Sequence, residues 1–129
     1  MQPNVYKERM LKLESRDMDA VNKRLTPEIV RLIHAGFGLV TETGEIVDQL
    51  KKHIFYGANL DKVNIKEELG DVMWYTNIIL DVFGWSLEEV MQVNHDKLVK
   101  RYGDKFSEDR ANVRDLDAER EILENGGGS

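Results

Sequence analysis

The 129-residue sequence contains no cysteine, which excludes disulfide bonds and any metal site built from thiolates. The same absence agrees with a reducing setting, and we predict a cytoplasmic location. No run approaches the roughly 20 apolar residues that a membrane span needs, and residues 1–12 carry no signal-peptide pattern. No segment alternates apolar and polar residues as strands do. These absences favour an all-α protein without a membrane partner.

Basic residues are outnumbered by acidic ones, 18 to 24. The formal net charge is −6, which makes broad contact with a nucleic-acid backbone unfavourable. The excess is greatest from residue 104 onward, where eight acidic residues face four basic ones. We therefore expect no nucleic-acid polymer as a partner, and an anionic ligand needs metal ions or a local basic cluster.

Several nucleotide and metal motifs are also missing. The sequence has no Gly-x-x-x-x-Gly-Lys phosphate loop and no EF-hand pattern. The residues three before the histidines are Arg31, Leu50 and Gln92, so the Glu-x-x-His motif of di-iron bundles is absent. Iron is therefore disfavoured.

The first half of the chain predicts two helices. Val5–Leu25 has apolar residues at irregular helical spacing, which indicates a loosely held or partner-packed helix. Thr26-Pro27 pairs a capping hydroxyl with a first-turn proline and predicts a long helix to about Tyr56, ending near Gly57. Three internal glycines each cost about 1 kcal/mol relative to alanine, so we expect them to permit close approach of a helix or a ligand.

The second half predicts two more helices. One runs from about residue 61 or 64 to Phe83, before Gly84, and is apolar almost all round. That pattern predicts burial on more than one side, including a subunit interface. The capping box Ser86-Leu-Glu-Glu89 opens a fourth helix, which ends near Tyr102.

These patterns divide the chain into three parts. We predict a helical extension over residues 1–25, a helical domain over 26–106 and a polar tail over 107–129, partly flexible and glycine-rich at its end. The length suits one domain large enough to bury its own core. The predicted fold class is all-α, a four-helix bundle completed by dimerisation.

Two acidic pairs stand out on the apolar helices, Glu42 with Glu45 and Glu68 with Asp71. Side chains three residues apart share a helix face, so antiparallel packing would bring four carboxylates together. Ionised groups on apolar helices are costly unless paired or metal-bound, and oxygen ligands suit Mg²⁺, with Mn²⁺ as a substitute. Acidic pairs also occur elsewhere in the sequence, so an ordinary solvated helix face is the alternative for any single pair.

Four further side chains are candidate pocket residues by helical position. Lys52 lies two turns beyond the first acidic pair, and Tyr75 lies one turn beyond the second. His34 lies three turns before Glu45, roughly 16 Å away by helical rise, and it either lines a pocket or is a partly buried structural histidine. Trp74 either stacks on a base or, as we favour, packs in the core.

The fourth helix carries a polar face made of Asn94, Lys97 and Arg101. Taken alone, this is an ordinary polar surface. Beside a metal cluster it becomes a candidate phosphate-binding face. Arg101 would offer a bidentate guanidinium, Lys97 an ammonium point charge and Asn94 a neutral amide donor.

Three motifs lie at residues 34–45 (HAGFGLVTETGE), 64–75 (NIKEELGDVMWY) and 94–102 (NHDKLVKRY). Together they resemble the MazG-like all-α nucleoside triphosphate pyrophosphohydrolases, and the resemblance covers about Pro27–Phe106. It implies Mg²⁺ held by four carboxylates and phosphate bound by the basic face of the fourth helix. The metal ligands implied are Glu42, Glu45, Glu68 and Asp71, and the phosphate ligands are Asn94, Lys97 and Arg101, with Tyr102 nearby.

The resemblance also implies that a (deoxy)nucleoside triphosphate and water give a monophosphate and pyrophosphate, and that the chain forms a homodimer or a dimer of dimers. Metal ions lower the pKa of the attacking water and neutralise the triphosphate. A carboxylate not fully committed to metal can accept the proton of that water, and we predict Glu42 or Glu45, with Glu42 slightly ahead. The alternative is a non-catalytic helical nucleotide- and metal-binding sensor or interaction module.

Overall fold

A computed structural model describes residues 1–103 and 115–125 of the chain. Within these residues the protein forms six helices and no strand, so the predicted all-α class is confirmed. The helices are α1 (Pro3–Leu11), α2 (Met18–Arg24), α3 (Pro27–Tyr56), α4 (Lys62–Phe83), α5 (Leu87–Tyr102) and α7 (Leu116–Asn125).

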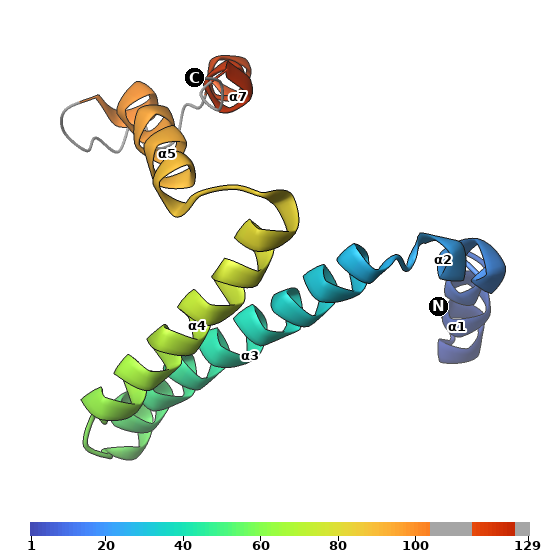
Figure 1. The fold of residues 1–129 in the computed structure, drawn as a ribbon. Helices are drawn as coiled ribbons and strands as arrows, with labels where there is room; N and C mark the ends of the chain where they lie inside the picture. Colours follow the sequence, from blue (N-terminus) through green and yellow to red (C-terminus); the bar gives the residue numbers. More distant parts are fainter. Residues whose placement is uncertain (104–114, 126–129) are drawn as a thin grey trace.

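Helices α3 and α4 pack against each other as an antiparallel hairpin, the main tertiary contact of the described residues (Figure 1). The predicted signals set the ends of α3. The Thr26 hydroxyl accepts a hydrogen bond from the Ile29 amide at 3.3 Å, and Gly57 ends the helix in the left-handed region with φ 69°. These bounds confirm the prediction for the long helix.

The second arm of the hairpin is also bounded as predicted. The Asp61 carboxylate accepts hydrogen bonds from the Val63 and Asn64 amides, both at 3.0 Å, and caps α4. Gly84 ends the helix with φ 68°. At the other end of the hairpin, an ion pair between Arg31 and Asp81 connects the start of α3 to the end of α4.

Helices α5 and α7 form a second pair, which stands apart from the hairpin in Figure 1. The Ser86 hydroxyl caps α5 by accepting a hydrogen bond from the Glu89 amide at 3.0 Å, as predicted. Helix α7 lies inside the segment predicted as a polar, partly flexible tail, and the sequence analysis did not predict this helix. Asp115 caps α7 through the Ala118 amide. The glycine-rich end at 126–129 lies outside the described residues.

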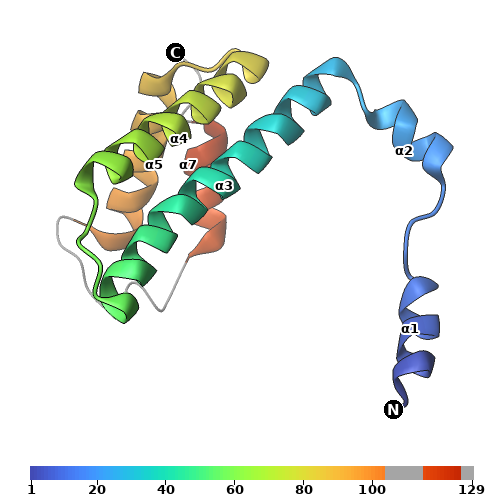
Figure 2. The same ribbon diagram turned by 90° about the horizontal axis from the view of Figure 1, so that it is seen from below.

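The N-terminal extension is not the single helix predicted over Val5–Leu25. It is divided into α1 and α2, which run away from the α3–α4 hairpin (Figures 1 and 2). The break follows from local chemistry, because the Asp17 side chain accepts a hydrogen bond from the Ala20 amide and starts a new helix. Neither helix contains a buried residue.

The described residues do not bury the core that we expected of a chain of this length. Among the described residues, Ala35 and Leu80 are the only buried hydrophobic side chains. The all-round apolar character of α4 does not give burial within one chain, since Trp74 is 57% exposed. No helix of the described residues is long and apolar enough to cross a bilayer.

The outer face of α3 carries an apolar stripe, which follows a repeat of alternating three- and four-residue steps. Its exposed members are Val30, Ile33, Phe37, Val40, Val47 and Ile54, with Gly44 in the same register, and Lys51 interrupts the stripe between Val47 and Ile54. This spacing is the pattern of helices that pack against another helix along one seam. The stripe faces solvent in the single chain. Among the described residues, helix α3 therefore packs against another helix only on its α4 side.

Candidate metal centre

Three acidic side chains from the two arms of the hairpin come together. Glu42 on α3 and Glu68 and Asp71 on α4 each offer a carboxylate oxygen, and these oxygens lie within 4.8 Å of one another. Glu68 is buried at 8% exposure, and the other two are half-buried. We call these three residues the carboxylate cluster. Antiparallel packing places the shared face of Glu68 and Asp71 opposite Glu42.

The chemistry of the carboxylate cluster fits a hard divalent cation. Within the described parts of the chain, no lysine or arginine forms an ion pair with any of its members. Close anions repel one another, and a buried carboxylate without a compensating charge is unfavourable. Carboxylate oxygens are the ligands that Mg²⁺ prefers, so the three residues would be able to hold such an ion between the two helices.

Glu45, the fourth predicted ligand, does not belong to this cluster. It lies one turn after Glu42 on α3 and its side chain is exposed. A step of three residues rotates it by about 60° around the helix from Glu42. Glu45 is therefore a carboxylate beside the cluster but not committed to it.

Two amide side chains that we did not single out from the sequence are linked to Glu68, one directly and the other through the first. The Asn64 side-chain amide donates to Glu68 Oε1 at 2.7 Å, and the Gln49 side-chain amide donates to Asn64 Oδ1 at 2.6 Å. The signal was available, because Asn64 lies one turn before Glu68 and Gln49 lies two turns beyond Glu42. Both side chains are half-buried.

Lys52 is held by a carboxylate on its own helix. Asp48 forms ion pairs with both Lys51 and Lys52, the latter at 2.6 Å. Hydrogen bonds from Lys51 and then Lys52 lower the pKa of Asp48 below its ordinary value, and the same pairing raises the pKa of Lys51. Two ammonium groups against one carboxylate leave a net positive charge at this end of α3.

The aromatic candidates form one group on the hairpin. The His34 ring meets the Tyr75 ring edge-on, with centroids 5.6 Å apart, and Trp74 lies 4.8 Å from Tyr75 at a tilt of 30°. His34 is exposed, so it is not the partly buried structural histidine that we considered. Trp74 is also exposed, which contradicts the favoured core-packing interpretation within the single chain. Its indole presents a free apolar surface next to Tyr75.

The predicted phosphate-binding face lies on α5. Figure 1 shows α5 apart from the α3–α4 hairpin, whose residues form the carboxylate cluster. Asn94 is exposed and Lys97 is half-buried. Arg101 binds Glu119 of α7 through two hydrogen bonds, at 2.7 Å from Nε and 2.5 Å from the second guanidinium nitrogen. Its guanidinium also lies 5.6 Å from the centroid of the Tyr102 ring. The hydrogen bonds that Arg101 makes with Glu119 and then with Tyr102 raise the pKa of Arg101.

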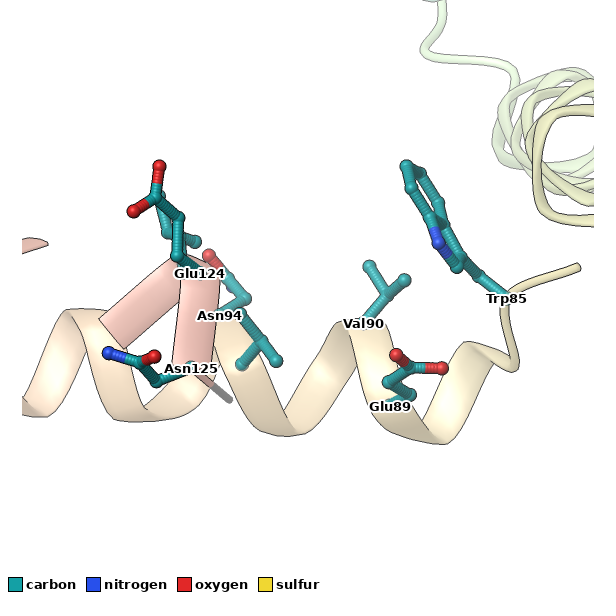
Figure 3. A pocket seen from close by; sticks show the side chains of 8 residues that line it. Trp85, Glu89, Val90, Asn94, Glu124 and Asn125 are labelled. Atoms are coloured by element: carbon teal, nitrogen blue, oxygen red, sulfur yellow. The ribbon is translucent and has the colours of Figure 1, made fainter. Parts of the chain in front are cut away.

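Asn94 also lines an open pocket of 790 Å³ between α5 and α7. Its walls include Trp85 at the start of α5 and Glu124 and Asn125 on α7. Figure 3 shows Asn94 beside the α7 residues, with Trp85 at the other end. Trp85 stacks on Phe83, with ring centroids 4.4 Å apart. No member of the carboxylate cluster lines this pocket.

Fold and site together define an all-α protein with a candidate cation centre on a helical hairpin. Residues 35–106, more than half of the chain, match the family model described as the MazG nucleotide pyrophosphohydrolase domain, and the chain belongs to this family. A relative from Bacillus subtilis (strain 168), named "Uncharacterized protein YvdC", is 33% identical over 89 residues, which are 62% of this chain and 83% of the relative. No solved structure matches the chain. The predicted family resemblance is confirmed.

Proposed function

We propose that this protein is a divalent-metal-dependent nucleotide pyrophosphohydrolase that cleaves (deoxy)nucleoside triphosphates to a monophosphate and pyrophosphate. The observation that carries the proposal is the carboxylate cluster of Glu42, Glu68 and Asp71, which gathers three anions from two helices without a lysine or arginine partner in the described chain. Membership of the MazG family supports the same reaction class.

The carboxylates divide into two roles in this proposal. The three members of the carboxylate cluster hold Mg²⁺, which Mn²⁺ can replace, and when bound the ion activates water and neutralises phosphate charge. Glu45 is exposed and outside the cluster, so it is the carboxylate that remains available to accept the proton of the attacking water. This placement favours Glu45 over Glu42 as the general base and reverses the order that we expected from the sequence.

The nucleotide is held by groups from several helices. We assign Asn94, Lys97 and Arg101 to the phosphates, and Lys52, which is paired with Asp48, adds positive charge farther along α3. For Arg101 this role requires that phosphate replaces the Glu119 carboxylate on the guanidinium. The exposed indole of Trp74 is the surface on which a base can stack. Its neighbours Tyr75, His34 and, near the phosphates, Tyr102 complete the proposed pocket.

A second copy of the chain completes both the fold and the site in this proposal. A chain with two buried hydrophobic side chains among its described residues lacks the core of a stable monomer. The apolar stripe on α3 offers a seam for a second helix, and its exposed members are large apolar residues such as Phe37 and Val40. Assembly also provides a second α5, so the phosphate-binding face can reach a carboxylate cluster from which it stands apart in one chain.

Product analysis tests the reaction. The purified protein is incubated with Mg²⁺ and each of the eight common ribo- and deoxyribonucleoside triphosphates, and pyrophosphate is separated from orthophosphate. Monophosphate plus pyrophosphate from a subset of these is the expected result, and it also identifies the preferred base and sugar. Orthophosphate release would show cleavage at a different bond and would contradict the proposal. Saturable nucleotide binding without turnover would instead support the alternative of a helical nucleotide sensor.

A further inference from the structure

The hydrogen bonds around Glu68 form a chain that begins on the other arm of the hairpin. Gln49 on α3 donates to Asn64 at 2.6 Å, and Asn64 on α4 donates to Glu68 at 2.7 Å. The chain therefore crosses from α3 to α4 and ends on the most buried member of the carboxylate cluster.

The direction of each hydrogen bond follows from the ionised carboxylate of Glu68, at which the chain of hydrogen bonds ends. An ionised Glu68 only accepts hydrogen bonds, so Asn64 must turn its NH₂ group toward the carboxylate. The Asn64 carbonyl oxygen then faces α3, where it accepts from the NH₂ group of Gln49. One arrangement of both amides satisfies the whole chain, and a flip of either amide would break it.

The backbone of Asn64 is held as well. Its amide donates to the Asp61 carboxylate at 3.0 Å, the contact that caps α4. Asn64 is thus anchored at its main chain by Asp61 and at its side chain by Gln49. A side chain fixed at both ends can hold Glu68 in one orientation with little loss of conformational entropy when a ligand binds.

We infer that Asn64, held by Gln49, is a positioning residue that orients the Glu68 carboxylate for a divalent cation. This inference rests on the proposed metal site. A neutral amide satisfies one carboxylate oxygen of the buried Glu68 without cancelling its charge, whereas a lysine or arginine in the same place would neutralise it. The cation then meets a preorganised anion with one oxygen already engaged, in the manner of outer-shell partners in metal sites.

The test measures Mn²⁺ binding by titration calorimetry, without nucleotide. Asn64→Leu and Gln49→Met remove the amides at nearly constant volume. We expect Asn64→Leu to weaken Mn²⁺ binding by about tenfold, within the range for outer-shell partners, and Gln49→Met to weaken it less. Because Gln49 acts through Asn64, the double variant should bind as Asn64→Leu alone does. Asn77→Leu is the matched control, since Asn77 lies on the same helix and its amide donates to a backbone carbonyl.

Two results would overturn the inference. Unchanged Mn²⁺ affinity in Asn64→Leu, with binding abolished in Glu68→Gln, would leave the metal site intact and remove the positioning role. Additive effects of the two amide substitutions would show that Gln49 does not act through Asn64. A wild-type protein that binds Mn²⁺ but hydrolyses no nucleotide contradicts only the proposed reaction, and absence of Mn²⁺ binding by the wild type contradicts both. Circular dichroism melts confirm that each variant is folded.

Discussion

The ring of Tyr75 on α4 lies directly against the backbone of Gly38 on α3, so that a Cβ atom at residue 38 would come within 2.3 Å of the ring. Gly38 is itself buried. The glycine therefore sets how closely the two arms of the hairpin approach. The close packing of α3 against α4 also brings Glu42 toward Glu68 and Asp71, so the carboxylate cluster depends on it.

Gly38→Ala should destabilise the protein. The clash with Tyr75 costs about 1–3 kcal/mol as overpacking, against a gain of about 1 kcal/mol in helix propensity. Gly36→Ala is the control, because nothing lies within 4 Å of a Cβ at that residue, and it should raise stability slightly. Denaturant unfolding of both variants measures the difference. Equal stability of the two would show that Tyr75 moves aside without cost.

Glu68→Gln and Asp71→Asn should lower Mg²⁺-dependent activity by about 100-fold or more, since each removes a carboxylate from the proposed coordination sphere. Both should leave the metal-free melting temperature equal or higher, because they relieve repulsion among anions within 4.8 Å of one another. The rise in melting temperature on adding Mg²⁺ should disappear. Scanning calorimetry with and without Mg²⁺ checks this.

Glu67→Gln provides the control for these two variants. Glu67 is adjacent to Glu68 but exposed, and it does not belong to the carboxylate cluster. It should retain both the activity and the Mg²⁺-dependent stabilisation. Undiminished activity in Glu68→Gln would contradict the assignment of Glu68 as a metal ligand.

Glu119→Gln should lower the KM for a nucleoside triphosphate if Arg101 binds phosphate, because a neutral amide no longer competes for the guanidinium. It should also loosen α7, since one partner of a buried ion pair is lost. Steady-state kinetics and limited proteolysis measure the two effects. Glu121→Gln, on the exposed side of the same helix, is the control. A loosened α7 with an unchanged KM would mean that Arg101 only anchors the helix.

The stability contributed by Asp48 should depend on pH. Lys51 and Lys52 lower its pKa in the folded protein below the ordinary 3.8. A carboxylate with a lowered folded-state pKa contributes stability above its unfolded pKa and loses it as the pH falls through the folded value. The difference in free energy of unfolding between wild type and Asp48→Asn should therefore be constant near neutral pH and vanish below pH 3.8. A difference that persists in strong acid would mean that the ion pairs are not its cause.

Val40→Glu should shift the protein toward monomer. Val40 is 72% exposed within the apolar stripe, and a buried unpaired carboxylate is unfavourable in a helix seam. Size-exclusion chromatography with light scattering measures the mass over a range of concentrations. Val63→Glu, at a position that is 79% exposed outside the stripe, is the control and should not change the mass. A wild-type protein that is monomeric at all concentrations would contradict the proposed assembly.

Local signals in the sequence were enough for the main helices. Thr26 and Gly57 bound α3 and Gly84 ends α4, because caps and left-handed glycines act through neighbours in the chain. The acidic pairs were recognisable for the same reason, since three-residue spacing sets a shared helix face. The break between α1 and α2 was missed, because Asp17 competes as a cap within a weakly amphipathic segment.

The sequence by itself determined the helical class, the bounds of the hairpin, and the acidic residues from which the candidate centre is built. These depend on contacts within a few residues. Only the tertiary structure decided that Glu42, Glu68 and Asp71 converge while Glu45 does not, and that Glu119 engages Arg101 across 18 residues. Such choices depend on the rotation of each helix about its axis and on how closely the helices pack, which are set by distant partners such as Gly38 and Tyr75.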